Sequence, residues 1–331
     1  MQVLVLAGGV GSRMMPWTAD TPKPLLPMLD KTLLERVVES IPKDLIDEVI
    51  ISGGYKAEQI EEYFTSQDSG FDVRIISEDE PLGTGGAIAN CKDAISGTFA
   101  CFNGDVISSL DMAEMLSMHK MKKGLGTIGL WEVEDPTRFG IVGIDESSKV
   151  TKFLEKPRPE QVFSNLINAG SYILEEDVFD IMPDGRHSIE RDVFPVMAEQ
   201  GSLYGMPFDG YFIDAGTPKS WQDGISACIE HREVGSGIVR DQSWIDHESV
   251  IGDESLISES MIASLAQIGD KSIVTKSSIL SGAVIGSGSV ITSSLVGKGA
   301  RIAPGISLNN CVIGNGEVIT TSLEDSKVPS L

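Results

Sequence analysis

One regularity constrains the fold of this chain more than any other: after residue 244, single aliphatic residues recur every 17 positions. Each period carries three of them, spaced 6, 5 and 6 residues apart. A chain that turns three corners in each period places one aliphatic side chain on each of three faces, where it stacks on its equivalent in the next period. The pattern therefore predicts a three-faced solenoid with a core of three series: Ile251, Ile268, Ile285, Ile302 and Ile319; Ile257, Val274, Ile291 and Leu308; and Ile245, Ile262, Ile279, Val296 and Ile313.

Small residues keep the same period and mark the corners of the solenoid. One set follows the first aliphatic series and the other precedes the third: Gly252, Gly269 and Gly286; Ser260, Ser277 and Ser294. The arrangement resembles the left-handed parallel β-helix of hexapeptide-repeat proteins, with one face shortened by a residue. We expect a short left-handed parallel β-helix of 17-residue coils over residues 243–323, followed by a polar end, SLEDSKVPSL.

Residues 1–235 follow a different sequence pattern, in which short apolar runs alternate with amphipathic segments. Such alternation is typical of an α/β domain with a mixed, mostly parallel sheet. The expected strands are 2–6, 48–52, 72–77, 99–103, 125–131, 140–144, 150–154, 168–174, 203–208 and 211–214; the expected helices are 31–40, 56–65, 84–94, 111–120 and one opened by Thr217 and Pro218. Because ligands bind at the carboxyl ends of the strands in such sheets, we expect residues 8–11, 53–54, 78–86 and 103–105 along one edge.

Composition limits the classes of protein to which the chain can belong. Its 331 residues can hold one large domain and a smaller one. A net charge of −23 and a pI near 4.5 argue against nucleic acid or an anionic membrane as a partner. The four cysteines form no C-x-x-C pair, which favours buried free thiols over a zinc site or disulfides. No signal peptide and no run of 18 apolar residues is present, so we expect a cytoplasmic protein.

The first strand leads directly into a glycine-rich loop. Gly8, Gly9 and Gly11 let the backbone turn sharply and direct several N–H groups toward one point, which suits a phosphate chain. Arg13 and Lys23 add two cations to the same stretch. A Walker loop is excluded because no Lys-Ser or Lys-Thr follows at its spacing, and a Rossmann fingerprint is incomplete. The loop predicts a site for a polyanion such as a nucleoside triphosphate.

Residues 6–27, LAGGVGSRMMPWTADTPKPLLP, resemble the signature of the nucleoside-diphosphate-sugar pyrophosphorylases, which are sugar-1-phosphate nucleotidyltransferases. Ser12, Met14 and Trp17 depart from that signature without removing a charge or a glycine. The motifs SIERDVFP and GYFIDAGTPKSW are especially similar to the mannose-1-phosphate guanylyltransferase subgroup. The resemblance implies a Rossmann-like nucleotidyltransferase domain. Its catalytic residues would be Arg13, Lys23 and Lys156, and its first nucleotide-binding residues Leu6, Ala7, Gly8, Gly9, Gly11 and Ser12.

Two aspartates are candidates for a metal site. Asp105 follows a buried strand in FNGDV, and Asp214 follows another in GYFIDAG. Carboxylate oxygens are hard ligands of the kind that Mg²⁺ prefers. In the family that the chain resembles, these two positions hold the catalytic metal, so we expect Mg²⁺ on Asp105 and Asp214.

A second glycine-rich loop, EDEPLGTGGAI at residues 78–88, resembles the base-binding loop of the same family. It adds Glu78, Gly83 and Thr84 to the expected nucleotide site. In relatives that use UTP or dTTP, glutamine usually occupies the position of Glu78. A carboxylate only accepts hydrogen bonds, and guanine offers two adjacent donors, N1–H and N2–H₂. Glu78 therefore favours GTP.

Three further motifs resemble the sugar-phosphate side of the family's site. Gly140 in FGIVGID would let the backbone approach the sugar, and Glu155 in KFLEKP would accept hydrogen bonds from its hydroxyls. Lys156 would bind the sugar phosphate, and Asn168 in INAGSYIL would be a hydroxyl partner. The implied reaction is in-line transfer of a nucleotidyl group from GTP to mannose 1-phosphate, with release of pyrophosphate.

Several alternatives stay open at this point. The sugar could be a heptose 1-phosphate, or glucose 1-phosphate used with UTP or dTTP. A non-catalytic regulatory subunit that binds nucleotide sugar is an alternative of another class, but such subunits tend to lose the glycine loop or its cations. Acetyl transfer is disfavoured because no histidine follows His247, and molybdopterin guanylylation is disfavoured by the PKPLLP, EKP and NAG motifs. The stacked solenoid offers a dimerisation surface, so we expect a homo-oligomer.

Overall fold

The computed structural model describes residues 1–66, 70–78, 80–232, 234–235 and 237–329. These residues form two compact units. We call Met1–Gly9 together with Leu34–Phe212 the α/β unit, and Val10–Leu33 together with Ile213–Leu331 the β-helix unit. The boundary between them crosses the first glycine-rich loop between Gly9 and Val10.

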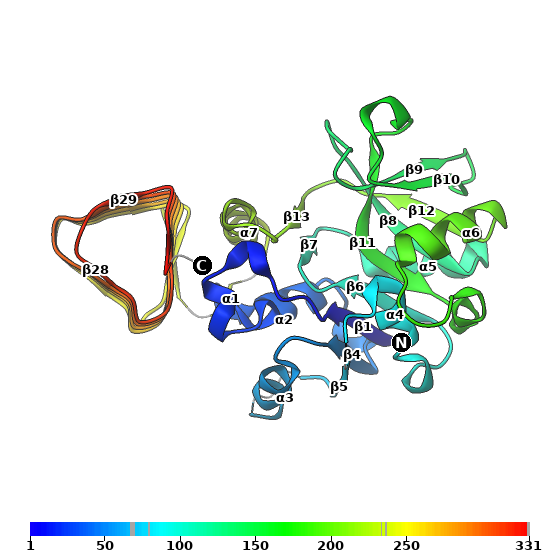
Figure 1. Ribbon diagram of the computed structural model, residues 1–331, viewed down its shortest axis with the longest axis horizontal. Helices are drawn as coiled ribbons and strands as arrows, with labels where there is room; N and C mark the ends of the chain where they lie inside the picture. The colour runs from blue at the N-terminus through cyan, green and yellow to red at the C-terminus, as the bar shows by residue number, and fades with distance from the viewer. Residues whose placement is uncertain (67–69, 79, 233, 236, 330–331) are drawn as a thin grey trace. The chain divides into compact units, whose positions relative to one another are not determined.

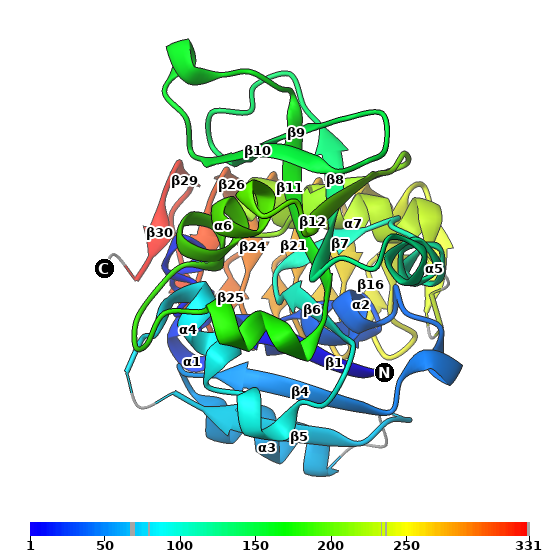
Figure 2. The same cartoon turned by 90° about the vertical axis from the view of Figure 1, so that its right-hand side faces the viewer.

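The described residues of the α/β unit form a nine-stranded mixed sheet. Its strands are β1 (Gln2–Ala7), β4 (Glu48–Gly53), β5 (Val73–Ser77), β6 (Phe99–Asn103), β8 (Gly126–Glu132), β9 (Gly140–Ile144), β10 (Val150–Glu155), β11 (Leu166–Leu174) and β12 (Leu203–Pro207). The order is β10-β9-β11-β6-β1-β4-β5, with β8 paired to β11 and β12 paired to β8. Strand β1 runs parallel to β4 and β6, whereas β11 runs antiparallel to β6 and β8. Figure 2 shows β5, β4 and β1 side by side. Each of the nine predicted strands up to residue 208 is confirmed to within two residues.

Five α-helices and shorter segments connect these strands. They are α2 (Leu33–Val38), α3 (Ala57–Ser66), α4 (Gly83–Ala89), α5 (Met112–Lys122) and α6 (Phe194–Glu199), where α2 starts at the unit boundary, with a short strand β7 (Val106–Ser108) and a π-helical segment η7 (Ile189–Val193). Asp111 begins α5 as its N-cap, accepting hydrogen bonds from the amides of Ala113 and Glu114. The prediction for 84–94 was too long. Helix α4 ends at Ala89, and a separate 3₁₀ turn follows at Lys92–Ala94, because glycine-rich sequence propagates a helix poorly.

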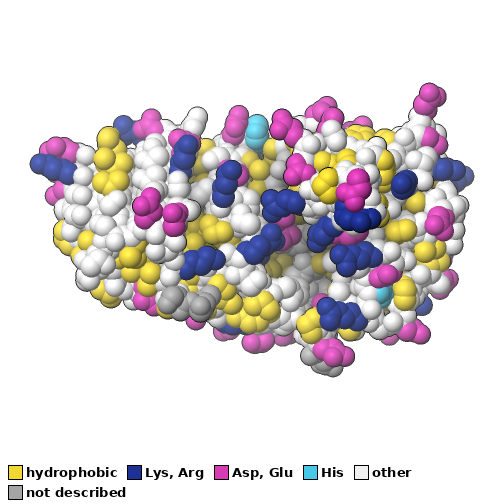
Figure 3. Space-filling model, turned by 45° about the horizontal axis from the view of Figure 1, so that its top comes forward, with side chains coloured by type: hydrophobic (Ala, Val, Ile, Leu, Met, Phe, Trp, Pro, Cys, Tyr) yellow, Lys and Arg dark blue, Asp and Glu magenta, His cyan; other side chains and the backbone are white. Residues whose placement is uncertain are grey.

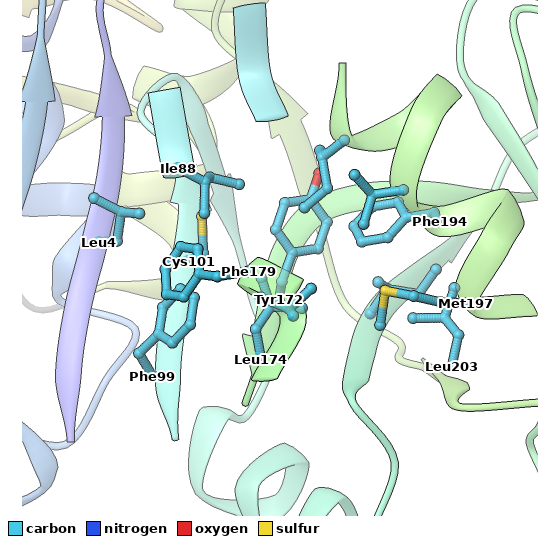
Figure 4. Packing of buried hydrophobic residues seen from close by; sticks show 14 of the residues in the cluster. Leu4, Ile88, Phe99, Cys101, Tyr172, Leu174, Phe179, Phe194, Met197 and Leu203 are labelled. Carbon is cyan, nitrogen blue, oxygen red and sulfur yellow. The ribbon is translucent and has the colours of Figure 1, made fainter. Parts of the chain in front are cut away.

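The core of the α/β unit lies where the central strands meet α4 and α6. Figure 4 shows Leu4 of β1 and Ile88 of α4 near Phe99 and Cys101 of β6, with Tyr172 of β11 beside Phe194. Phe99 stacks on Phe179 with 5.8 Å between ring centroids. The four cysteines are buried free thiols, as predicted.

The β-helix consists of three stacks of short strands, all parallel except the first strand of the first stack, which pairs antiparallel with the next. The first stack holds β14 (Ile238–Arg240), β15 (Ser243–Ile245), β18 (Met261–Ile262), β21 (Ser278–Ile279), β24 (Leu295–Val296), β27 (Val312–Ile313) and β30 (Lys327–Val328). The second holds β16 (Val250–Ile251), β19 (Gln267–Ile268), β22 (Val284–Ile285), β25 (Arg301–Ile302) and β28 (Val318–Ile319). The third holds β17 (Leu256–Ser258), β20 (Ile273–Thr275), β23 (Val290–Thr292), β26 (Ser307–Asn309) and β29 (Leu323–Glu324). The coils have a triangular outline in Figure 1, as the left-handed parallel β-helix predicted for this region requires.

The 17-residue period sets the register of this β-helix. Ile268 pairs with Ile285 on one face, and Ile262 pairs with Ile279 on another. The aliphatic residues of the inner coils are buried as predicted. The first coil is the exception, because no earlier coil covers it: Ile251 is 37% exposed, and Ile245 and Ile257 are half-buried. Strand pairing also continues into the tail that we expected to be only a polar end.

Buried serines connect neighbouring coils at one corner. The hydroxyl of Ser260 accepts a hydrogen bond from the amide of Ser277 at 3.1 Å, and the hydroxyl of Ser277 accepts one from the amide of Ser294 at 3.0 Å. All three serines are fully buried. Each hydroxyl therefore satisfies a backbone group that would otherwise be buried without a partner.

The rest of the β-helix unit consists of residues 10–33 and a helix that precedes the β-helix. Its elements are the 3₁₀ turns Ser12–Met14 and Lys23–Leu25, α1 (Trp17–Asp20), the hairpin strands β2 (Pro27–Met28) and β3 (Lys31–Thr32), β13 (Phe212–Asp214) at the unit boundary, and α7 (Pro218–His231). Thr217 and Pro218 begin α7 as predicted, and the hydroxyl of Thr217 accepts a hydrogen bond from the amide of Ser220. Strand β13 is not part of the nine-stranded sheet.

Acidic and basic side chains both occur on the face that Figure 3 shows. No helix among the described residues is long and apolar enough to cross a membrane.

Candidate active site

The carboxyl ends of three parallel strands meet at one edge of the α/β sheet. Ala7, the last residue of β1, pairs with Gly53, the last residue of β4. Leu6 pairs with Asn103 at the end of β6. The loops after these strands, which begin at Gly8, Gly54 and Gly104, therefore start next to each other. This edge confirms the expected placement of the first glycine loop beside residues 53–54 and 103–105.

Glu78 lies against the α-carbon of Gly8. A β-carbon added to Gly8 would be 2.7 Å from Oε1 of Glu78, so only glycine leaves room for the carboxylate in this position. The hydroxyl of Ser52 donates to Oε1 at 3.3 Å, and the amide of Leu82 donates to Oε2 at 3.0 Å. Two donors from different segments thus hold the predicted base-selecting carboxylate at the start of the first glycine loop.

Gly9 differs from its neighbour in having open space around it. Among the described residues, no heavy atom beyond its chain neighbours lies within 4 Å of where its β-carbon would be. The protein itself therefore gives no steric reason for glycine at this position.

The β-helix unit contains the second half of the loop. Gly11 has a φ of 67°, in the left-handed region that favours glycine. A β-carbon added to it would lie 3.2 Å from Cβ of Lys23, so the stem of Lys23 passes along the glycine backbone. Only 7% of the surface of Lys23 is exposed. A lysine with so little exposure next to a glycine turn can anchor an anion.

Arg13 and Asp214 both lie against Gly216. A β-carbon added to Gly216 would collide with the guanidinium of Arg13 and would be 2.7 Å from Oδ1 of Asp214. Two predicted site residues that are 201 positions apart in the chain thus meet within the β-helix unit. A cation and a carboxylate at one point give this unit a pair of groups that can contact a phosphate and a metal ion.

The second glycine loop packs closely on residues 185–190 of its own unit. The amides of Gly85 and Gly86 donate to the carbonyl of His187 at 3.1 and 3.2 Å, and the amide of His187 donates to the carbonyl of Leu82. A β-carbon added to Gly85 would lie 2.6 Å from Nε2 of His187. The glycines of this loop therefore make room for the protein's own chain.

Thr84 takes part in the same contact. Its hydroxyl donates to Oε2 of Glu190 at 2.6 Å, and the hydroxyl of Ser188 donates to the same oxygen at 2.6 Å. The hydroxyl that we expected to face the nucleotide is thus engaged with a carboxylate. Sequence reasoning missed His187 and Glu190 as residues of this region, although the motif that contains Glu190 was noted for its similarity to the family.

The sugar side of the expected site is built on the hairpin of β9 and β10. Gly140 pairs with Glu155, and a β-carbon added to Gly140 would lie 2.7 Å from Oε2 of Glu155. The ammonium of Lys156 is 3.5 Å from Oε1 of Glu155, with the Lys156 side chain 60% exposed. Burial raises the pKa of the Glu155 carboxyl, the nearby Glu190 carboxylate raises it further, and Lys156 lowers it. The structure thus brings Gly140, Glu155 and Lys156 together.

Asn168 lies on β11, and its side chain is bonded to its own strand. Its amide donates to the hydroxyl of Tyr172 at 3.0 Å, and its carbonyl oxygen accepts from the amide of Gly170 at 2.9 Å. One oxygen lone pair remains for a hydroxyl partner.

Asn103 is a polar residue that our site prediction omitted. Its side chain lies beside Gly170, where an added β-carbon would be 2.7 Å from Nδ2. Its Oδ1 is buried and accepts no hydrogen bond from any described residue. A buried acceptor without a donor is costly, so this oxygen is suited to a ligand's hydroxyl or amino group. The sequence signal was its position at a strand end, two residues before Asp105.

The two expected metal ligands belong to different units, Asp105 to the α/β unit and Asp214 to the β-helix unit. The described residues contain no group of three or more His, Cys, Asp or Glu side chains that could hold a metal ion.

The family model described as nucleotidyl transferase matches residues 2–230, well over half of the chain. The chain belongs to the nucleotidyl transferase family. The matched segment includes both glycine loops as well as Asp105 and Asp214.

Curated relatives and solved structures agree with this family. The mannose-1-phosphate guanylyltransferase catalytic subunit beta of Xenopus tropicalis is 36% identical over 237 residues, which are 70% of this chain and 65% of that protein. The mannose-1-phosphate guanylyltransferase of Mycobacterium tuberculosis is 37% identical over 234 residues, 69% of this chain and 65% of that protein. The alignments thus span just under two thirds of the length of these relatives. The crystal structure of HddC from Yersinia pseudotuberculosis complexed with GMP-PN is 31% identical, with a TM-score of 0.58, and covers 68% of this chain and 97% of HddC.

Proposed function

We propose that this nucleotidyl transferase family member makes GDP-mannose and pyrophosphate from GTP and mannose 1-phosphate. An oxygen of the sugar phosphate forms a bond to the α-phosphorus of GTP. The bond from that phosphorus to the oxygen that bridges to the β-phosphorus breaks, and pyrophosphate leaves with the electron pair. The attacking oxygen is already an anion, so the reaction requires no general base and no covalent intermediate.

The position of the Glu78 carboxylate carries the choice of nucleotide. It lies at the start of the phosphate-type loop, next to Gly8, and is held there by Ser52 and the amide of Leu82. A carboxylate can accept from both N1–H and N2–H₂ of guanine, whereas the imide edge of uracil or thymine presents one donor between two acceptors. The names of the curated relatives and the GMP-PN ligand of HddC support the same nucleotide.

Two cations of the first glycine loop also favour a reaction between polyanionic substrates. A protein with a net charge of −23 must suppress repulsion of two polyanionic substrates wherever it binds them. Arg13 and Lys23 stand in the glycine loop, where Arg13 would contact the leaving β- and γ-phosphates and Lys23 the α-phosphate or the sugar phosphate. Fixed charges of this kind stabilise a transition state because they need no reorganisation as charge develops.

Asp105 and Asp214 would hold Mg²⁺, and their hard carboxylate oxygens fit this ion. When bound, the ion supplies neutralisation of phosphate charge and orientation of the two substrates.

The sugar would be recognised on the β9–β10 hairpin and on β11. The Glu155 carboxylate, for which Gly140 makes room, would accept hydrogen bonds from hydroxyls, and Lys156 would contact the sugar phosphate. Asn168 and the buried Oδ1 of Asn103 would serve as further hydroxyl partners.

The decisive experiment measures pyrophosphate release with Mg²⁺ for GTP, UTP, dTTP, ATP and CTP, each with mannose 1-phosphate, glucose 1-phosphate and a heptose 1-phosphate. We expect release with GTP and mannose 1-phosphate. Release with UTP or dTTP and glucose 1-phosphate would keep the reaction but overturn guanine selection by Glu78, and GTP with the heptose would overturn the sugar. No release in any combination would overturn the enzymatic proposal in favour of a regulatory subunit.

Removal of one charged group tests the assigned roles. Lys23→Ala and Asp105→Ala should each lower kcat by on the order of 10²-fold or more, as loss of one charge-stabilising group commonly does. Lys120→Ala, which removes an exposed lysine from α5, is the matched control and should leave kcat within about twofold of the wild type. Near-normal turnover of Lys23→Ala or Asp105→Ala would contradict the role of that residue.

A further inference from the structure

Residues 10–33, which carry the cations of the phosphate-type loop, form one compact unit with the β-helix. Side chains from both segments make the contacts. Trp17 donates from Nε1 to the carbonyl of Ile313 at 3.0 Å, and Lys327 donates from Nζ to the carbonyl of Arg13 at 2.9 Å. The β-helix of this chain therefore touches the backbone of the residue that would contact the leaving phosphates.

The Trp17 contact is the buried part of this interface. Trp17 is 1% exposed, and its ring meets Trp221 of α7 edge to face with 6.2 Å between centroids. Ile313, whose carbonyl it reaches, is one of the inward aliphatic residues of the 17-residue period and is fully buried. A buried hydrogen bond of this kind orients the indole as well as stabilising it.

The residues after Ile313 continue the same interface. A β-carbon added to Gly314 would lie 3.3 Å from Cγ of Pro16, so the coil backbone passes close to the proline. Asn315 donates from Nδ2 to Oδ2 of Asp20 at 3.3 Å, while its own Oδ1 accepts from the amide of Lys298 in the preceding coil. One turn of the β-helix, residues 313–315, thus contacts residues 16–20.

The Lys327 contact is the exposed part and lies nearest to the chemistry. Arg13 is the middle residue of a single 3₁₀ turn, Ser12–Met14, and so short a turn leaves carbonyls without a partner inside it. A lysine ammonium commonly satisfies such carbonyls at the end of a helical turn. Lys327 belongs to β30 in the last coil, where its strand pairs with β27. The last coil therefore fixes the backbone from which the Arg13 guanidinium reaches Gly216.

We propose that the last two coils of the β-helix position Arg13 for a polyphosphate, with Lys327 and Trp17 as positioning residues. The inference rests on the proposed function, in which Arg13 contacts the departing pyrophosphate. It gives the β-helix a role within its own subunit, in addition to any role in assembly. A substitution that breaks these contacts in the last coils should then weaken binding of pyrophosphate and of the triphosphate, while leaving recognition of the sugar unaffected.

The test uses the full chain and two readouts. The first is the dissociation constant of Mg²⁺-pyrophosphate, measured by titration calorimetry, and the second is KM for GTP and for mannose 1-phosphate. Lys327→Met should weaken pyrophosphate binding and raise KM for GTP by about threefold to tenfold, the range that one hydrogen bond supports, with KM for the sugar phosphate within about twofold. Lys327→Arg, which keeps a charged donor, should recover most of the loss.

Lys271→Met is the matched control, because it removes a lysine from an early coil, where the ammonium is 4.0 Å from Glu254. It should leave both readouts within about twofold of the wild type. Unchanged pyrophosphate binding in Lys327→Met, or an equal loss in Lys271→Met, would overturn the proposal. The binding readout needs no turnover, so a wild type that binds pyrophosphate but releases none would count against the proposed function and leave the positioning role to be judged on binding alone.

The two neighbouring tryptophans provide a second, independent pair of variants. Trp17→Phe removes the hydrogen bond to Ile313 and keeps an aromatic ring. Trp221→Phe makes the same chemical change where the buried indole N–H has no hydrogen-bond partner among the described residues. We expect pyrophosphate binding to weaken about threefold in Trp17→Phe and to stay within about 1.5-fold in Trp221→Phe, with both variants folded by circular dichroism. Equal binding by the two folded variants would argue against the role of Trp17.

Discussion

The two glycine-rich loops of this protein have similar composition and different surroundings. In the second loop, added β-carbons at Gly83 and Gly85 would lie 2.5 Å from the His187 carbonyl and 2.9 Å from the Ile189 amide nitrogen, so the glycines make room for the protein's own backbone. In the first loop, Gly9 has no described heavy atom near the position of a β-carbon. Gly8 and Gly11 of the first loop are also required, by the Glu78 carboxylate and by a φ of 67°, but Gly9 carries no steric requirement from the described residues. Because the fold does not require glycine at position 9, Gly9 is the residue that suggests a bound ligand at the first loop.

Gly85→Ala should have the largest effect on stability, because the new methyl group meets backbone that cannot move without disturbing the contact with residues 185–190. We expect a loss of about 3 kcal/mol, equivalent to a fall in Tm of roughly 6–12 °C by calorimetry. Adding His187→Ala should recover part of this loss, since one of the two clashing groups is then gone. A Tm within about 2 °C of the wild type would show that the second loop is no more constrained than the first.

Gly9→Ala should leave stability almost unchanged and lower activity. Its backbone is outside the left-handed region and its surroundings are open, so Tm should stay within about 1 °C of the wild type. If the loop lies against phosphates, the methyl group displaces them, and kcat/KM for GTP should fall by about 10²-fold. Full activity in a stable Gly9→Ala protein would show that the open space at Gly9 is not filled by phosphates.

The smallest expected effect is the change in Tm when Glu155, at the end of β10, is replaced. The pKa of Glu155 is raised, first by burial and then by Glu190, so ionisation of Glu155 costs more in the folded state than in the unfolded state. Its contribution to stability is therefore fully present below its ordinary pKa, near 4.5, and is lost as pH rises through the higher folded value. Glu155→Gln should raise Tm by on the order of 1–3 °C at pH 8, with a smaller gain at pH 5.

Scanning calorimetry at the two pH values checks this sign, and Glu160→Gln is the matched control because 64% of the Glu160 side chain is exposed. The control should shift Tm by less than about 1 °C at either pH. A Glu155→Gln gain that is larger at pH 5 than at pH 8 would contradict the assignment. Sugar recognition should suffer in Glu155→Gln even though the fold gains stability, as is common at functional sites.

The β-helix was predictable in detail because its contacts repeat. Each coil pairs with the next at a separation of 17 residues, so a one-dimensional pattern determines which side chains face inward. The prediction failed only at the two ends, where Ile251 is exposed and where the last strands pair at a separation of 15 residues, as Leu308 does with Leu323. The helix start at Thr217 was also predictable, since the cap is a local interaction.

The surroundings of the site were not predictable in this way. Thr84 and Glu190 are 106 residues apart, and nothing in the local pattern of either segment indicates that they meet. The same holds for Arg13 and Asp214, and for Trp17 and Ile313, 296 residues apart. The motifs identified candidate residues one by one, but aperiodic tertiary packing determines which of them share a partner.

The hydrogen bond from Lys327 to Arg13 joins positions 314 residues apart in the chain. At an elongation rate of about 5–20 residues per second, a ribosome would need roughly 15 to 60 s to add the lysine after it has added the arginine. Throughout that interval the nascent protein has the start of its phosphate loop without the coil that contacts it. Arg13 can reach its final backbone position only after Lys327 has been synthesised, which links the onset of activity to translation of the coil that contains this lysine.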